Sequence, residues 1–295
     1  YVSAMRGFGR GLRKGISNWY LSQDPSRLSN LLAKYQSRNG WSNRDVLRLT
    51  HANPRSDDHK ALLHWAAKGW DSVGDEPHSN PVLAPIWAFE SAKRLNVQTD
   101  VKKMIGLIND YNLPRECVPT EFLNNIEIWD ALLQKMPITA MIRNLGKMTS
   151  IGLIGPNSEA ARIVSERLVD VNILKRGRVH PVSVLMAHSI YGSGHGMKGS
   201  LSWSPVGQVV SAMEKSFYAS FASVITTGKR FYLGLDVSGS MGIDSISGTN
   251  LTPRDASAAM AMVTMRTEGA CYAAGFTGGG HNYYGNRKTE YSNDL

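Results

Sequence analysis

The sequence predicts a mainly α-helical, HEAT-like repeat protein followed by the first part of an α/β domain. Up to about residue 225, apolar residues recur at helical spacing and prolines fall between the periodic segments. After that point an apolar run, an amphipathic segment and a second apolar run follow in the order strand, helix, strand. We therefore expect a helical region at residues 1–225 and an α/β domain at residues 226–295.

Composition narrows the class of protein. The chain has 295 residues and two cysteines, Cys117 and Cys271, which favours a reduced, cytoplasmic location over a secreted, disulfide-rich one. It contains no apolar run long enough for a membrane span and no signal-peptide pattern at its start, so we expect no membrane partner.

Positive charge is concentrated near the N-terminus. The formal net charge is +9, and residues 1–60 carry 11 Lys and Arg against 4 Asp and Glu, a net charge of +7. A localised basic surface is typical of proteins that bind phosphate backbones. The alternative is an ordinary solvated face.

The first periodic segment predicts a helix with one apolar stripe, formed by Met5, Phe8, Leu12, Ile16 and Trp19. Basic residues flank this stripe: Arg10, Arg13 and Lys14. The glycines between them, including Gly11 and Gly15, each cost a helix about 1 kcal/mol relative to Ala. Their presence indicates close approach of another backbone or of a ligand.

A second helix is predicted from Asp24-Pro25, a capping acid followed by proline, to a stop at Asn39-Gly40. Lys34 and Arg38 are four residues apart, so we expect both to project from one exposed side of this helix. Its expected core face comprises Leu28, Leu31, Leu32 and Tyr35.

A third helix begins with a capping box, Ser42 and Asp45, and ends near His51. Arg44 and Arg48 form another basic pair four residues apart. The aromatic residues of this region sit largely at core spacing, so we expect few of them to be free to stack on bases: Phe8, Trp19, Tyr20, Tyr35 and Trp41.

Further helices are predicted at 56–70, 82–95, 100–111, 126–136, 138–148, 158–171, 181–190 and 205–225. About ten helices joined by short turns favour a solenoid of stacked helix pairs. Two stretches fit simple packing less well. Arg143 and Lys147 flank Gly146, and residues 191–199 are glycine-rich with a basic tip, which predicts a mobile surface loop.

The strongest chemical signal follows the apolar run at residues 229–235. Asp236, Ser238 and Ser240 form a D-x-S-x-S array at the end of a predicted strand, the edge where α/β sheets bind ligands. One carboxylate and two hydroxyls suit Mg²⁺, which keeps several waters. The alternative is a polar turn.

The α/β segment is incomplete as a sheet. A helix at 252–267 and a strand at 271–276 follow the array, and residues 278–295 are predicted to be loop. A sheet of this kind needs further strands to cover its faces, so we expect the chain to be a piece of a longer protein, with further metal ligands beyond Leu295.

The strand-D-x-S-x-S-helix pattern resembles the von Willebrand factor A domain with its metal-ion-dependent adhesion site. Several preceding stretches resemble the TROVE module of the Ro autoantigen family, in order from residue 1 to about residue 276: 9–14, 19–20, 34–42, 47–51, 136–137, 143–148, 194–196 and 227–231. Together these motifs are far more specific than the metal motif alone.

The resemblance implies a ring of HEAT-like helices closed by an A domain. It implies a non-catalytic protein that binds small non-coding Y-like RNAs on its outer face and takes up the single-stranded ends of misfolded RNAs. An exoribonuclease or another protein partner is also implied. The family's RNA contacts fall on Lys34, Arg38 and His51 of this sequence, and its first three metal ligands fall on Asp236, Ser238 and Ser240. Without the resemblance, His51 is a helix-end histidine satisfied by backbone.

Two other classes compete with this interpretation. An adhesive or scaffolding protein would bind an acidic partner through Mg²⁺ at the A domain, but it has no need of the basic segment at residues 1–60. An enzyme is disfavoured because His188 and His195 have no cysteine or carboxylate at catalytic spacing.

Overall fold

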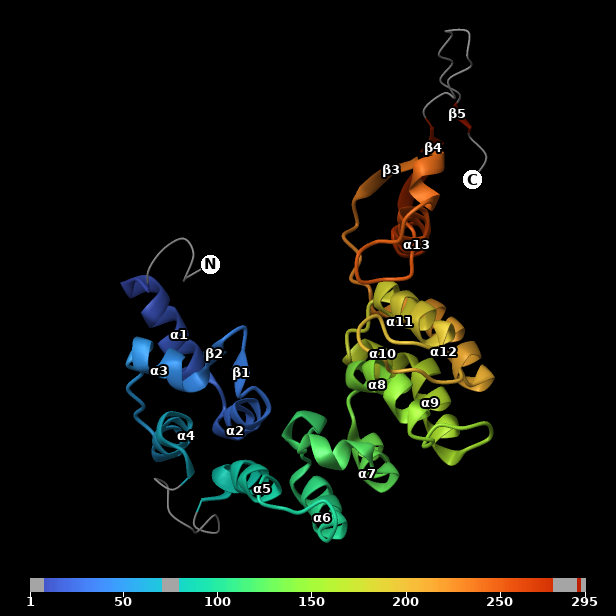
Figure 1. The fold of residues 1–295 in the computed structure, drawn as a ribbon. Helices are drawn as coiled ribbons and strands as arrows, with labels where there is room; N and C mark the ends of the chain where they lie inside the picture. The colour runs from blue at the N-terminus through green and yellow to red at the C-terminus, as the bar shows by residue number, and fades with distance from the viewer. Residues whose placement is uncertain (1–7, 71–79, 278–290, 293–295) are drawn as a thin grey trace. The chain divides into compact units, whose positions relative to one another are not determined.

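The computed structural model describes residues 8–70, 80–277 and 291–292, which divide into two compact units, Tyr1–Lys135 and Met136–Leu295 (Figure 1). Both are dominated by helices, and a small parallel sheet lies in the second unit. The mainly α fold with an α/β segment is thus confirmed. The domain boundary predicted at residue 225 lies inside the second unit and stays a prediction.

Short helices that pack on their neighbours build the first unit. Its α-helices are α1 (Arg10–Ser22), α2 (Pro25–Lys34), α3 (Asn43–Thr50), α4 (Asp57–Lys68), α5 (Ala84–Ala92), α6 (Val101–Tyr111) and α7 (Ile126–Lys135). Short 3₁₀ turns lie at Pro81–Leu83, Arg115–Cys117 and Thr120–Asn124. Helix α2 packs on α4 and α5, α5 on α6, and α6 on α7, the neighbour-to-neighbour packing of a helical repeat.

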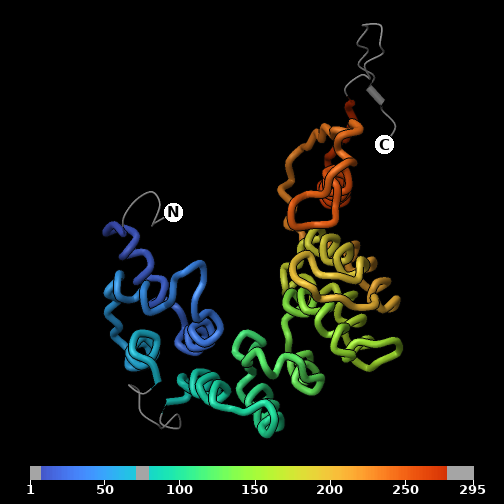
Figure 2. Tube along the Cα trace, viewed as in Figure 1, coloured from blue at the N-terminus to red at the C-terminus, as the bar shows by residue number. Residues whose placement is uncertain are grey.

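The predicted second helix is shorter than expected. Asp24 accepts a hydrogen bond from Arg27 N, as a capping residue should, but α2 ends at Lys34. Strands β1 (Ser37–Arg38) and β2 (Trp41–Ser42) then form an antiparallel hairpin around Asn39-Gly40 (Figure 2). Both turn residues have positive φ, 51° and 77°, which is why an Asn-Gly pair favours a hairpin turn. The sequence prediction treated the pair only as a helix stop.

Five α-helices open the second unit: α8 (Ile138–Ser150), α9 (Glu159–Val169), α10 (Val171–Arg176), α11 (Pro181–Ser193) and α12 (Gly207–Ala219), followed by a 3₁₀ turn at Ser220–Ser223. The helix predicted at 158–171 is confirmed as α9, but it ends at Val169, because the Asp170 carboxylate caps a separate helix, α10, by accepting from Asn172 N and Ile173 N. Helix α12 packs on α9 and α11 around Val209 and Met213, which are fully buried.

The α/β segment follows the predicted order. Strand β3 (Arg230–Asp236) pairs in parallel with β4 (Ala270–Phe276), and α13 (Pro253–Thr267) makes the crossover. A third strand, β5 (Tyr291–Ser292), pairs antiparallel with β4, so the prediction of loop throughout 278–295 is wrong at these two residues. The rest of that stretch lies outside the described residues.

One face of this sheet is open. In β3, half-buried and exposed side chains alternate, and Tyr232 is 71% exposed where it stacks on Tyr272 of β4. Within the described part of the chain, no second layer covers the tyrosine side of the sheet. Among the described helices, none is long and apolar enough to cross a membrane.

Candidate nucleic-acid interface and metal loop

The basic residues of the first helix lie on its solvent side. Arg10, Arg13 and Lys14 are exposed, and Arg13 Nε donates to Phe8 O at 3.0 Å. The opposite side of α1 rests on α3. Ser17 Oγ donates to Thr50 O at 3.3 Å there, and Tyr20 OH donates to Asn43 Oδ1 at 2.8 Å. The basic residues of α1 and α3 therefore sit on one packed helix pair.

Helix α1 begins later than its apolar spacing predicted. Gly9 is its N-cap, Met5 lies outside the described residues, and Leu12 and Trp19 are 39% and 47% exposed. Tyr20 is the buried residue of the helix, at 3%. The predicted stripe is thus wrong, because the face that α3 covers is set by Tyr20.

Lys34 and Arg38 are not on one helix face, as the sequence predicted. Lys34 ends α2, and Arg38 lies on β1 and is exposed. The Lys34 side chain is 27% exposed, with its Nζ 3.9 Å from Glu116 Oε1 and 5.4 Å from the centroid of the Tyr35 ring. Lys34 is therefore held by a carboxylate and an aromatic ring, whereas Arg38 projects into solvent from the hairpin.

The third helix presents its basic pair as predicted. Arg44 and Arg48 are exposed on α3, one turn apart. Between them, Asp45 completes the capping box: Ser42 N and Ser42 Oγ donate to Asp45 Oδ2 at 3.0 and 2.6 Å. These bonds, with smaller contributions from Arg48 and Arg44, hold the pKa of Asp45 below its ordinary value. The Asp45 carboxylate is therefore occupied by the hydrogen bonds of the helix cap.

His51 occupies the C-cap of α3 in the left-handed conformation, with φ 49°. Its backbone N–H donates to Leu47 O at 3.0 Å, and the residue is exposed. The backbone satisfies the helix end, as expected without the family resemblance, yet the imidazole remains accessible to a ligand.

Sequence spacing missed two lysines near this surface. A cavity of about 310 Å³ beside Arg44 is also lined by Lys68 at the end of α4 and Lys93 after α5. Glu90 is the acid in its lining. Its Oε2 lies 2.5 Å from Lys93 Nζ, and its Oε1 accepts a hydrogen bond from Trp65 Nε1 at 3.1 Å. No local motif joins these residues, because they come from three different helices.

Two aromatic side chains in the basic region are open to solvent. Trp19 and Tyr35 are each 47% exposed. The prediction that the aromatics of this region belong to the core is therefore wrong for these two. Tyr35 lies just after α2 ends, so the early end of that helix moves it out of the core face.

The D-x-S-x-S array forms a compact loop after β3. Asp236 Oδ1 accepts from Ser238 N at 2.9 Å, and the hydroxyls of Ser238 and Ser240 are 3.1 Å apart. The bonds from Ser238 hold the pKa of Asp236 below its ordinary value, so the carboxylate is charged at neutral pH. One carboxylate and two hydroxyls turned into one loop fit a hard divalent cation.

An arginine borders this loop. Arg254, in the first turn of α13, donates from Nη2 to Ser238 O at 3.4 Å. Its guanidinium lies about 3.1 Å from the place where a Cβ on Gly242 would stand, so glycine keeps room for it. The described residues contain no group of three His, Cys, Asp or Glu that could hold a metal.

Two stretches singled out in the sequence meet at Trp203. Its indole covers Gly146 of α8, where a Cβ would lie 2.6 Å from the ring. Trp203 Nε1 donates to Tyr191 O at 2.9 Å, and Trp203 N donates to Gly194 O at 2.8 Å. The start of the glycine-rich segment is thus hydrogen-bonded to Trp203, which packs on α8. Residues 191–193 belong to α11, so the prediction of a loop is wrong for these three residues, and the mobility of the rest stays a prediction.

Comparison with known families agrees with this arrangement. Residues 110–192 match the TROVE domain, and residues 230–290 match the Ro60 vWA domain. The chain belongs to the Ro60 family. The predicted resemblance to TROVE and von Willebrand factor A modules is confirmed.

Individual relatives place the chain within this family. It is 37% identical over 280 residues to RNA-binding protein RO60 of Deinococcus radiodurans, covering 94% of this chain and 51% of that protein. RNA-binding protein RO60 of Caenorhabditis elegans is 33% identical over 300 residues, covering 89% and 46%. The chain therefore spans about half the length of the curated relatives it matches.

The fold is shared with a solved Ro60-family structure. The crystal structure of the Deinococcus radiodurans RO protein superposes with a TM-score of 0.76 at 36% identity, covering 93% of this chain and 54% of that one.

Proposed function

We propose that this Ro60-family chain is a non-catalytic RNA-binding protein that takes small structured, Y-like RNAs and the single-stranded ends of misfolded RNAs. Both relatives are named RNA-binding proteins, and the basic N-terminal region supports RNA binding by this chain. An exoribonuclease or other protein partner, and a cytoplasmic location, belong to the same proposal.

The observation that carries the proposal is a set of exposed cations able to meet phosphates. Asp45, the acid of α3, is hydrogen-bonded in a helix cap. The basic side chains of α1, β1 and α3 are exposed to solvent: Arg10, Arg13, Lys14, Arg38, Arg44 and Arg48. Cations on several rigid elements suit the shape and phosphates of a folded RNA.

Competition among three RNAs tests how the chain recognises its ligand. A hairpin with a single-stranded tail should compete better than a blunt duplex, and a scrambled but still paired stem should compete as well as the original. The reason is that phosphate and shape contacts carry little stem sequence. A blunt duplex that competes equally would refute tail recognition, and loss of binding on scrambling would indicate direct base readout.

We also propose that Asp236, Ser238 and Ser240 bind Mg²⁺, with the other ligands outside the described residues. Substituting Asp236→Ala should abolish Mg²⁺ binding, measured by calorimetry on the protein, and leave RNA affinity unchanged. Asp244→Ala, an exposed acid in the following loop, is the control. Parallel loss of Mg²⁺ and RNA binding would instead mean one composite site.

The Asp236→Ala variant also tests the alternative that the chain is an adhesive protein. The accessibility of the metal loop favours this alternative, because Ser240 is exposed and Ser238 is only half-buried. An adhesive protein would lose its acidic partner with Asp236→Ala and would be indifferent to the basic residues of α1 and α3. Pull-down of partners with this variant and with Arg44→Gln would decide between the two functions.

A further inference from the structure

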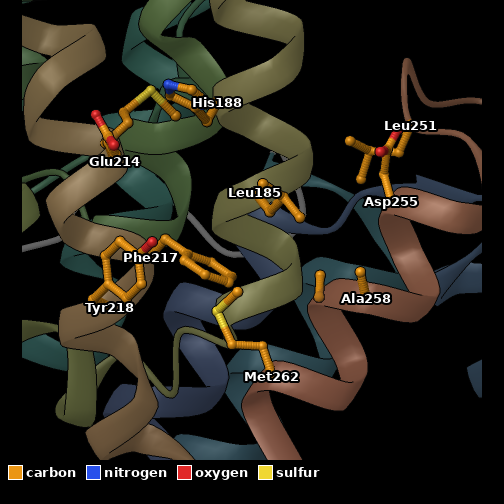
Figure 3. Close-up of a pocket in the computed structure, with 11 residues that line it drawn as sticks. Leu185, His188, Glu214, Phe217, Tyr218, Leu251, Asp255, Ala258 and Met262 are labelled. Carbon is orange, nitrogen blue, oxygen red and sulfur yellow. The ribbon is translucent and has the colours of Figure 1, made fainter. Parts of the chain in front are cut away.

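A cavity of about 390 Å³ in the second unit has a chemistry opposite to that of the basic surface. It lies between α11, α12 and α13 (Figure 3). Apolar side chains form most of the wall, including Leu185, Phe217, Ala258 and Met262. The size is within the range of sites that bind small molecules, which also lie typically between packed helices or domains.

Two carboxylates are among the polar groups of this cavity. Glu214 and Asp255 line it together with His188, and the lining contains no Lys or Arg although the chain carries a net charge of +9. In Figure 3, Glu214 lies on the α12 wall and Asp255 on the α13 wall, with Leu185 between them. A phosphate or carboxylate ligand would meet repulsion from both sides.

Both carboxylates have capacity left for a donor. The Glu214 carboxylate forms no hydrogen bond or ion pair with the described part of the chain. Asp255 Oδ2 accepts from Thr252 N and Oγ1 at 3.1 and 2.8 Å, which leaves Oδ1 available. The bonds from Thr252 also hold the pKa of Asp255 below its ordinary value, so this acid is charged at neutral pH.

Aromatic rings add a second attraction for a cation. Phe217 and Tyr218 line the cavity, and Phe217 is buried with its ring packed edge-on against Tyr218 at 5.2 Å between centroids. Aromatic faces attract ammonium ions through their quadrupole. A bare metal ion does not fit this set, because His188, Glu214 and Asp255 do not form a metal-holding group among the described residues.

We propose that this cavity binds a small organic ammonium ion with an aliphatic or aromatic body. The body would pack on Leu185, Phe217 and Met262, and the ammonium would donate to Glu214 or to Asp255. This inference does not depend on RNA binding, since none of the basic residues of α1, β1 or α3 takes part.

Matched small probes test the proposal on the protein. Hexylamine should bind at least about tenfold more tightly than hexanoate, which has the same chain length and the opposite charge, because a charge-assisted hydrogen bond replaces repulsion. 1,6-Diaminohexane should bind at least as well as hexylamine, since acids stand on both walls. Ligand-observed NMR at constant ionic strength measures all three. Equal binding of hexanoate and hexylamine would overturn the proposal.

Two variants locate the binding. Glu214→Gln should lower hexylamine affinity about fivefold to tenfold, by loss of a charge-assisted bond, and leave hexanoate no weaker. Ala258→Leu, at an exposed position of α13, should fill the cavity and remove binding of every probe without unfolding the helix. Glu127→Gln, an exposed glutamate on α7 outside the cavity, is the control. Unchanged hexylamine affinity in both cavity variants would show that the amine binds elsewhere.

Discussion

The N-terminal basic helices and the α8 region both place glycines among arginines and lysines, yet the two regions use glycine in opposite ways. In α1, a Cβ on Gly11 or Gly15 would meet no protein atom within 4 Å. In α8, a Cβ on Gly146 would lie 2.6 Å from the Trp203 ring. Similar sequence patterns therefore conceal an open surface in one case and a tightly packed contact in the other.

The largest effect should come from Gly146→Ala. Alanine favours a helix, but here its methyl group would strike an indole that is fixed by a bond to Tyr191 O. We expect the second unit to lose about 1–3 kcal/mol of unfolding free energy, as overpacked sites do. Denaturant unfolding followed by tryptophan fluorescence measures it.

Gly106→Ala in α6 is the matched control, because a Cβ there meets nothing within 4 Å. This variant should gain up to about 1 kcal/mol from helix propensity. If both variants are stabilised, Trp203 does not close over α8 in solution.

A second prediction concerns two basic residues of the N-terminal region. Substituting Lys34→Gln together with Arg38→Gln should weaken RNA binding about tenfold to a hundredfold. The salt dependence should also fall, by about 0.9 unit of slope for each phosphate that the protein no longer neutralises. Glutamine is preferable to glutamate, because an acid at position 34 would face Glu116 at the distance now occupied by an ion pair.

Arg94→Gln with Lys102→Gln is the control pair for this test, since both residues are exposed in the same unit and neither is in the ion pairs described above. Equal losses of affinity in the two double variants would mean that only net charge matters and that Lys34 and Arg38 form no site. Filter-binding titrations at several salt concentrations supply both the affinity and the slope.

Local sequence signals predicted much of this molecule, and contacts between distant segments explain what they missed. The capping box at Ser42, the strand that ends at Asp236 and the helix that begins after Thr252 follow from local residues, and all three form as expected. The contact of Trp203 with Gly146 and that of Lys34 with Glu116 join different elements. No spacing rule within one helix encodes such contacts.

The hairpin after α2 is a different kind of miss. The Asn39-Gly40 pair carries a hairpin signal, but each flanking strand has only two residues, too few to show an alternating pattern. Treating the segment as helix placed Lys34 and Arg38 on one face and Tyr35 in the core. Lys34 and Arg38 therefore lie on different elements and not on one helix face, and their part in RNA binding stays a prediction.

A smaller effect should follow from Tyr35→Ala. The ring is 47% exposed and lies beside Lys34 Nζ, so it can stack on an unpaired base next to a phosphate contact. Stacking on one base contributes about 1–3 kcal/mol, and removing the ring should weaken a tailed RNA more than a blunt duplex. Competition titrations with the two RNAs measure the difference. Equal weakening of the two would assign Tyr35 to positioning Lys34 instead.

The smallest change is expected from Gly15→Ala, and it separates two reasons for glycine in α1. If nothing approaches this face, alanine should raise the unfolding free energy by about 0.5–1 kcal/mol through helix propensity alone. Because Gly15 is exposed and its added Cβ meets no protein atom, we expect this gain with unchanged RNA affinity. Thermal unfolding and an RNA titration on the same sample give both quantities. A gain in stability accompanied by weaker RNA binding would show that RNA lies against the glycine, in a space that the protein itself leaves empty.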